Sequence, residues 1–129
     1  MISTIKTSNK IKLNFESATI YISLNDSQAA HAILGCLPFE SKVSTWGDEI
    51  YFETPVKTKL QTGVTEVKKG DVGYWPTGGA LCLFFGPTPI SKGERIVPAS
   101  AVDIIGKIEG NLSALKNISD GEEVRCEAG

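Results

Sequence analysis

Apolar and polar residues alternate in two neighbouring segments near the start of the chain. Residues 11–15 (Ile-Lys-Leu-Asn-Phe) alternate strictly, and Ile20, Ile22 and Leu24 repeat the same period of two. This alternation is typical of a strand with one buried face. Because Glu16-Ser17 between the segments suits a turn, the pattern predicts a first β-hairpin.

The period then changes to that of a helix. Apolar residues recur at spacings of three and four, which places them on one face of a short helix. They are Ala29, Ala30, Ile33, Leu34 and Leu37. The preceding Asn25-Asp26-Ser27 offers capping side chains, and Pro38 ends the predicted helix because proline disfavours helical geometry in the residue before it.

Strand patterns return after this helix. They predict strands at 41–45, 49–54, 102–108 and 122–126, and weaker strands at 56–60 and 64–67. A long loop is expected at 87–98 and a helical turn at 112–118. About eight strands and two short helices predict a mainly β fold, a closed barrel that leaves no exposed sheet edge. We expect one domain over residues 11–129, preceded by a flexible N-terminal end at residues 1–10.

The stretch Gly70–Pro89 holds the strongest strand signal. Ala80–Phe85 is an unbroken apolar run that glycine and proline residues bound on both sides, which is typical of a fully buried strand. Tyr74 and Trp75 precede it. On a strand these two side chains point to opposite faces, so only one of them can line a given surface.

Composition excludes several classes of function. The 129 residues are 41% hydrophobic and 22% charged, with a net charge of −2 and no basic stripe, so no nucleic-acid partner is expected. No segment has the length of a membrane helix, and no membrane partner is expected. Three dispersed cysteines without a Cys-x-x-Cys pair predict reduced thiols and a cytoplasmic protein. We expect neither a metal nor a cofactor.

The ionisable residues offer few candidates for chemistry. His31 is the only histidine and lies off the apolar face of the predicted helix, which favours a surface role. Asp48 and Asp71 each lie beside a glycine in a predicted turn, where aspartate commonly bonds the backbone. Glu49 shares a strand face with Tyr51 and should point away from the core. Cys82, within the apolar run, is interpreted as a small core residue.

Aromatic residues at strand ends and turns give the best signal for a binding surface. Trp46, Tyr51, Tyr74 and Trp75 combine a large apolar area with a polar group, which suits a groove that is partly wet. The alternative is that these rings only fill the mouth of the barrel, and the sequence favours neither interpretation.

Four segments resemble the small prokaryotic cyclophilin-like proteins, a family of unknown function. They are Thr45–Phe52, Gly70–Pro76, Cys82–Pro89 and Pro98–Val102. The resemblance implies a cyclophilin-like barrel. It also implies a ligand groove at the segments that match, for which the candidate residues are Trp46, Glu49, Tyr51, Tyr74, Trp75 and Phe84.

The chain departs from true cyclophilins at their catalytic residues. The Phe-His-Arg motif and the glutamine of the isomerase site have no match, and the two arginines are Arg95 in the long loop and Arg125 in the last strand. Prolyl isomerisation has a barrier of about 18–20 kcal/mol, which a guanidinium lowers by donating to the proline nitrogen of the twisted amide. The predicted function is therefore a module that binds a peptide or small molecule without prolyl isomerase catalysis.

Two alternatives remain open. One is a weak or altered peptidyl-prolyl cis-trans isomerase that uses a backbone donor or a lysine. The other is a subunit or scaffold of an amide-cleaving enzyme complex, because cyclophilin-like domains occur in such assemblies. The sequence leaves open a protein partner or a homo-oligomer.

Overall fold

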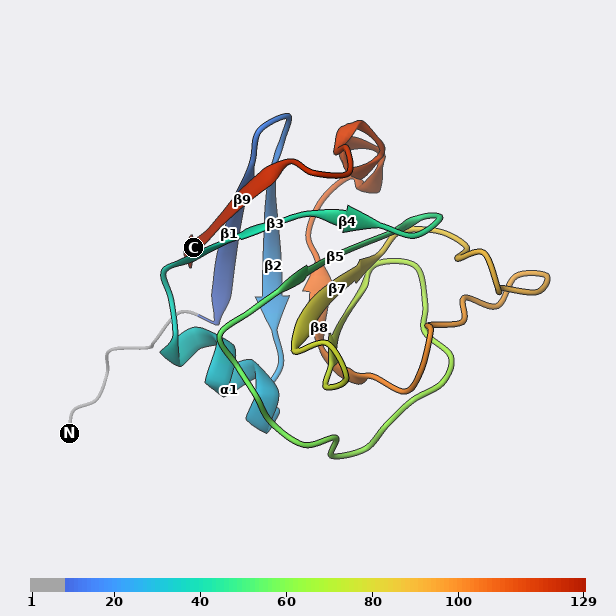
Figure 1. Cartoon of the computed structure of the whole chain (residues 1–129), viewed down its shortest axis with the longest axis horizontal. Coiled ribbons are helices and arrows are strands. Elements are labelled where there is room, and N and C mark those ends of the chain that lie inside the picture. Colours follow the sequence, from blue (N-terminus) through green and yellow to red (C-terminus); the bar gives the residue numbers. More distant parts are fainter. Residues whose placement is uncertain (1–8) are drawn as a thin grey trace.

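One antiparallel sheet of nine strands coils into a nearly closed barrel in the computed structural model, which describes residues 9–129 (Figure 1). The strand order is β3-β9-β1-β2-β8-β6-β7-β5-β4. The strands are β1 (Lys10–Phe15), β2 (Thr19–Leu24), β3 (Phe39–Lys42), β4 (Ser44–Thr45), β5 (Glu49–Glu53), β6 (Asp71–Trp75), β7 (Ala80–Phe84), β8 (Asp103–Ile108) and β9 (Glu123–Ala128).

The two edges of the sheet meet in one short segment of chain. Only Val43 separates β3 at one edge from β4 at the other, and its backbone N–H donates to Glu122 O at 2.8 Å. The chain thus switches from one edge to the other without leaving the barrel wall. This confirms the predicted mainly β barrel, with one strand more than expected.

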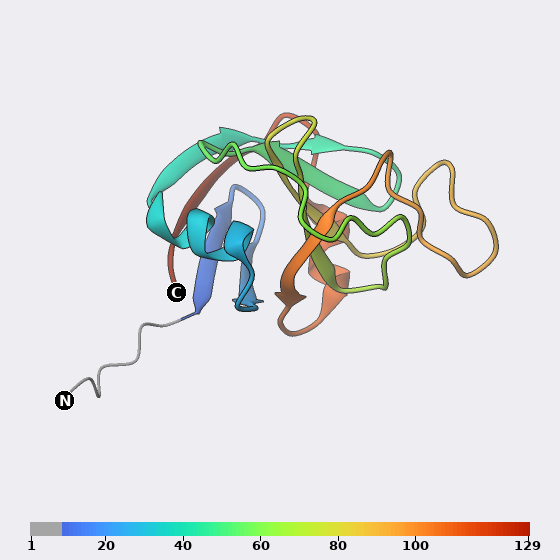
Figure 2. The same ribbon diagram turned by 90° about the horizontal axis from the view of Figure 1, so that it is seen from below.

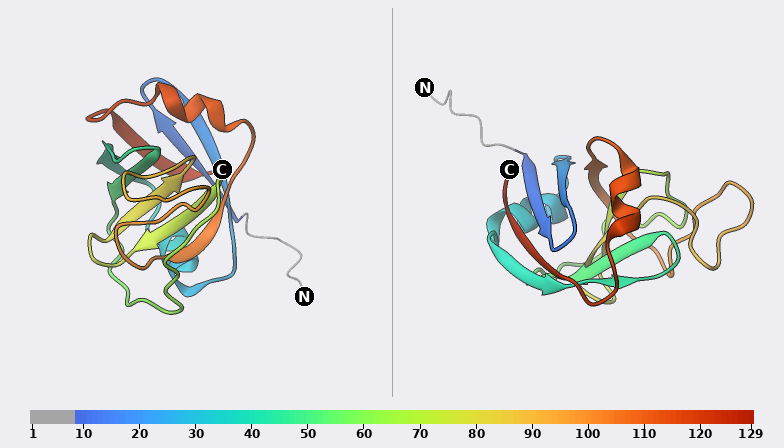
Figure 3. Two further views of the ribbon diagram at one scale, coloured as in Figure 1. Left: turned by 90° about the vertical axis from the view of Figure 1, so that its right-hand side faces the viewer. Right: turned by 90° about the horizontal axis from the view of Figure 1, so that it is seen from above.

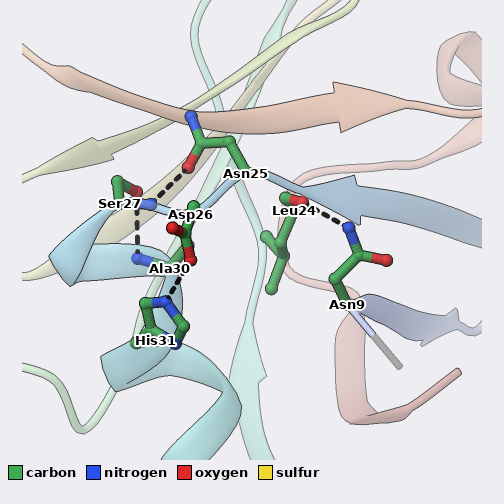
Figure 4. A network of polar contacts seen from close by, with 7 residues as sticks. All are labelled: Asn9, Leu24, Asn25, Asp26, Ser27, Ala30 and His31. Carbon is green, nitrogen blue, oxygen red and sulfur yellow. Dashed lines mark hydrogen bonds and ion pairs between the residues drawn. The ribbon is translucent and has the colours of Figure 1, made fainter. Parts of the chain in front are cut away.

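The first hairpin and the first helix follow the sequence pattern closely. β1 and β2 pair from Lys10↔Ser23 to Asn14↔Thr19. The helix α1 (Gln28–Gly35) begins after Ser27, whose Oγ accepts from Ala30 N at 3.3 Å (Figure 4). Of the predicted end at residues 1–10, residues 1–8 lie outside the described residues, and Lys10 already begins β1.

The helix α1 and the 3₁₀ helix η1 (Leu112–Asn117) lie on opposite sides of the barrel (Figure 3). Ala30 and Ile33 of α1 and Leu115 of η1 are fully buried against the strands. Their apolar contacts help to stabilise these short helices, because isolated helices of this length are marginal in water. No helix within residues 9–129 is long and apolar enough to span a membrane.

The buried residues form two separate clusters. The interior cluster fills the barrel and includes Ile50, Phe52, Tyr74, Leu81 and Leu83. The outer cluster lies on the opposite face of β5, β6 and β7, where loops cover the sheet. Its buried members are Val67, Cys82, Phe84, Ile96 and Val102.

Two loops supply this outer layer. The strands predicted at 56–60 and 64–67 do not form, and residues 54–70 instead make only isolated bridges, Val64↔Val102 and Val67↔Ile96. A side chain holds this loop in place of strand pairing. Asp103 accepts from the backbone N–H groups of residues 61–63 at 2.8–3.0 Å. Residues 86–101 form the second loop, at the end of the molecule opposite the C-terminus (Figure 2).

Candidate functional site

The tight turn between β4 and β5 places two candidate residues side by side. Trp46 N donates to Glu49 O at 2.9 Å, and Glu49 N donates to Trp46 O at 3.2 Å. Gly47 at the first turn position has φ +61°, a conformation that glycine adopts without strain. Because residues directly opposite in an antiparallel pair share one face, Trp46 and Glu49 point to the same side of the sheet.

The neighbouring strands extend this face across the sheet. Cys82 of β7 lies opposite Tyr51 of β5 on one side and opposite Gly73 of β6 on the other. The rings of Tyr51 and Trp75 pack edge to face, with centroids 6.3 Å apart and planes at 84°. Cys82 and Gly73 therefore form a floor with little side-chain bulk, and the rings of Tyr51 and Trp75 form a wall beside it.

The loop that precedes β8 covers part of this floor. The indole N–H of Trp75 donates to Ser100 Oγ at 2.5 Å, which fixes the ring against the loop. The space left between loop and sheet is a cavity of about 280 Å³. We call it the outer pocket; it is lined by Trp46, Glu49, Tyr51, Trp75, Cys82, Pro98, Ala99 and Val102.

Glu49 is the one acidic group in the lining of the outer pocket, and it is only 6% exposed. Burial raises the pKa of Glu49 to about 7, although a hydrogen bond from the Cys82 thiol opposes the shift. Burial also raises the pKa of Cys82 well above its usual value, and the nearby Glu49 raises it further. Near neutral pH, Cys82 is therefore a thiol and Glu49 exchanges between its two protonation states.

Four of the six predicted groove residues line the outer pocket. Trp46, Glu49, Tyr51 and Trp75 come together there, whereas Tyr74 and Phe84 are fully buried elsewhere. Tyr74 belongs to the interior cluster, and its hydroxyl donates to Val56 O at 2.7 Å. Tyr74 and Trp75 thus point to opposite faces, as their positions on a strand predicted.

Phe84 lies in the outer cluster without being among the lining residues. Sequence reasoning did not select Cys82, Pro98, Ala99 and Val102, which complete the lining. A signal for the three loop residues was present, because they lie in Pro98–Val102, one of the four segments that carry the family resemblance.

The remaining candidates lie outside the outer pocket. His31 is exposed on α1 and its Nε2 lies 2.7 Å from Asp26 Oδ1 (Figure 4). Asp71 pairs with Lys107 and accepts from Lys68 N at 2.8 Å, in keeping with its predicted role in a turn. No group of three or more His, Cys, Asp or Glu side chains in the described part of the chain is arranged to hold a metal ion.

Neither arginine is among the residues that line the outer pocket. Arg95 in the long loop pairs with Glu66 at 3.7 Å, and Arg125 on β9 pairs with Glu40 at 3.2 Å. Among the described residues that line the pocket, none is an arginine or a lysine. The polar donors that face the pocket are consequently neutral groups.

A second cavity adjoins the outer pocket. It has a volume of about 400 Å³ and shares Tyr51 and Trp75 with the outer pocket, so this aromatic pair separates the two spaces. Its other lining residues include Ser44, Glu53 and Gly78. An elongated ligand that crossed the aromatic pair would contact both.

A nearly closed antiparallel barrel with two short helices and a small aromatic pocket on its outer face defines a class of small, mainly β proteins. Within this class the chain belongs to the cyclophilin-like family, whose model matches residues 9–127. The fold is similar to the solution structure of a hypothetical protein from Archaeoglobus fulgidus, with a TM-score of 0.84. The two chains are 39% identical over 99% of this chain and 100% of that one. No curated protein matches the chain.

Proposed function

We propose that the protein binds a peptide side chain or a small molecule in the outer pocket and does not catalyse prolyl isomerisation. The supporting observation is the pocket itself, in which three aromatic side chains and one buried carboxyl group face a cavity without any cationic donor. Mostly apolar walls with a few polar groups are the usual composition of small-molecule sites. The volume, about 280 Å³, is suited to one side chain or headgroup.

The absence of a guanidinium from the lining supports a binding role over catalysis. The transition state of isomerisation is an amide twisted out of resonance, and rate enhancement requires a donor that binds this state more tightly than the planar one. Arg95 and Arg125 are already paired with acidic residues outside the outer pocket. Free thiols at Cys36, Cys82 and Cys126 support our further proposal of a cytoplasmic location.

The two tryptophans of the chain allow a direct binding test. Trp46 and Trp75 both line the outer pocket, so intrinsic fluorescence reports on its occupancy. We expect proline-containing peptides or small aromatic and aliphatic fragments to change the emission, and Tyr51→Ala to weaken the response. Tyr21→Ala is the matched control, because Tyr21 is an exposed tyrosine on β2.

A protease-coupled isomerisation assay tests the second half of the proposal. We expect no acceleration above the uncatalysed rate. Turnover comparable to that of a true cyclophilin, abolished by Glu49→Gln or Trp75→Leu, would contradict the proposal.

One observation favours weak isomerase activity as a second candidate. Because burial raises the pKa of Glu49 to about 7, a fraction of this carboxyl is protonated at neutral pH and can donate a hydrogen bond. This candidate predicts slow turnover that declines as the pH rises above 7. A complete absence of turnover at pH 6 would count against it. A role as a subunit of an amide-cleaving complex stays a prediction, which a search for copurifying partners would test.

A further inference from the structure

The outer pocket combines aromatic rings with a buried acid. Trp46, Tyr51 and Trp75 line it together with Glu49. The face of an aromatic ring carries partial negative charge, so rings that line a cavity attract a cation, most strongly when the cation is shielded from water. The acid adds a full negative charge whenever it is ionised.

Glu49 has no counter-charge among residues 9–129, the part of the chain that the structure describes. Its side chain is 6% exposed, and none of the ion pairs in the described part of the chain includes it. The other titratable groups in the lining are the Cys82 thiol on β7 and the Tyr51 hydroxyl on β5. A buried carboxylate without a counter-charge is costly even with the hydrogen bond from the Cys82 thiol, and a cationic ligand would supply the missing charge.

The polar groups of the lining restrict which cation fits. The main side-chain acceptors are the Glu49 carboxylate and the Tyr51 hydroxyl, and the Trp75 indole N–H already donates to Ser100. A guanidinium carries five N–H donors and a primary ammonium three, and donors left unpaired in a buried site weaken binding. A fully alkylated ammonium has none to satisfy, and its methyl groups suit the aromatic walls.

We propose that the outer pocket binds a trimethylated ammonium group, with Trp46, Tyr51 and Trp75 contacting its methyl groups and Glu49 supplying the opposite charge. This inference rests on the proposed function, because it names the ligand class of the same pocket. The group can come from a free quaternary ammonium compound or from a trimethylated lysine of a peptide.

A pair of matched ligands tests the role of charge. Choline and 3,3-dimethylbutan-1-ol have nearly the same shape, but the second carries carbon in place of the charged nitrogen. In titrations followed by tryptophan fluorescence, we expect choline to bind at least about tenfold more tightly. We expect Glu49→Gln to remove this preference, and Glu123→Gln, an exposed acid on β9 that lines neither cavity, to retain it.

The outcomes separate this inference from the proposed function. Equal affinity for the two ligands, or tighter binding of the alcohol, overturns the ammonium inference and still supports a binding pocket. A response to neither ligand also overturns the inference, and the peptide and fragment titrations then decide the proposed function separately. Should Glu49→Gln fail to fold, Trp75→Leu provides a second variant that should lose choline binding, with Trp46 as the remaining probe.

The source of the ammonium group requires a third ligand. A trimethyl-lysine peptide is titrated beside the same peptide with unmodified lysine. Tighter binding of the trimethylated form supports the proposal. A trimethylated peptide that binds more tightly than choline identifies a peptide source, and the reverse order identifies a free small molecule.

Discussion

Glu49 is an acidic side chain whose negative charge is disfavoured by its surroundings. The turn at Gly47-Asp48 directs its carboxyl toward the outer pocket, and the covering loop then removes it from water, leaving 6% exposed. Burial disfavours the ionised form, and the pKa rises to about 7 as a result. A group of this kind costs stability, and such sites often serve binding or catalysis.

The free-energy cost of burying Glu49 increases as the pH rises. The pKa of Glu49 in the folded protein, about 7, lies above its ordinary value of 4.5, so the unfolded chain loses this proton first as the pH rises. The favourable contribution of the protonated form is present below 4.5 and is lost between 4.5 and 7. Glu49→Gln should therefore be more stable than the wild type at pH 8, by on the order of 3 kcal/mol.

Urea unfolding at pH 4.5 and pH 8 measures this difference. The gain in Glu49→Gln should be much smaller at pH 4.5, where both proteins are neutral at this position. Glu53→Gln is the control, because this acid is exposed on the same strand. A Glu49→Gln protein less stable than the wild type at pH 8 would show that the ionised carboxylate is stabilised by groups we have not identified.

Gly73, on β6 where it pairs with β8, leaves room for Val102, which lines the outer pocket. The pairing of these strands shifts register between Val72 and Gly73, as at a β-bulge. A Cβ atom at Gly73 would lie 3.1 Å from Val102 Cγ2 and 3.4 Å from Phe84 Cε2. Val102 can pack closely on the sheet because position 73 has no side chain.

Gly73→Ala should consequently push Val102 outward and disturb the outer pocket. We expect a loss of about 1–2 kcal/mol in the free energy of unfolding, the usual effect of overpacking, together with changed tryptophan emission. Gly35→Ala is the matched control, because no atom beyond its chain neighbours and its own helix backbone lies within 4 Å of the added methyl group. Equal stability and equal emission in the two variants would mean that Val102 moves outward without lowering the free energy of unfolding.

The elements differ in how far local sequence determines them. The alternation of Ile11, Leu13 and Phe15 and the helical spacing of Ala30 and Ile33 record burial on one face, and both elements formed as predicted. Residues 56–60 and 64–67 gave only weak strand patterns, and in the structure Val56 and Val67 are buried whereas Leu60 is exposed. They lack a partner strand, however, and pairing between distant segments is not visible in local periodicity.

Local periodicity predicted only part of the candidate site, because it does not show contacts between distant segments. Alternation along β5 predicted that Glu49 and Tyr51 face away from the interior, and they do. That the face is covered by Pro98 and Val102 depends on where a long loop returns to the sheet. The burial of Glu49, and with it the raised pKa, follows from this tertiary contact rather than from the strand.

The whole molecule consists of a barrel and an outer layer with different means of support. The interior cluster is enclosed by strands that pair on both sides, except for the edge strands β3 and β4. The outer layer relies instead on isolated bridges and on side chains such as Tyr74 and Asp103. Segments with few backbone ladders and few buried contacts open at lower free energy than the core of a sheet.

Amide hydrogen exchange should separate the two layers. Val64 N and Val67 N donate only to the isolated bridge partners Val102 and Ile96, at 2.8 and 2.9 Å, and we expect them to exchange faster than amides in the centre of β7 such as Leu83. Occupation of the outer pocket should slow Val64 and Val102, because the ligand would rest against the loop that these bonds hold, while Leu83 should be unaffected. Exchange of all these amides at one rate would instead mean that the loops unfold only with the barrel, and the outer pocket would then be as rigid as the core on which it is built.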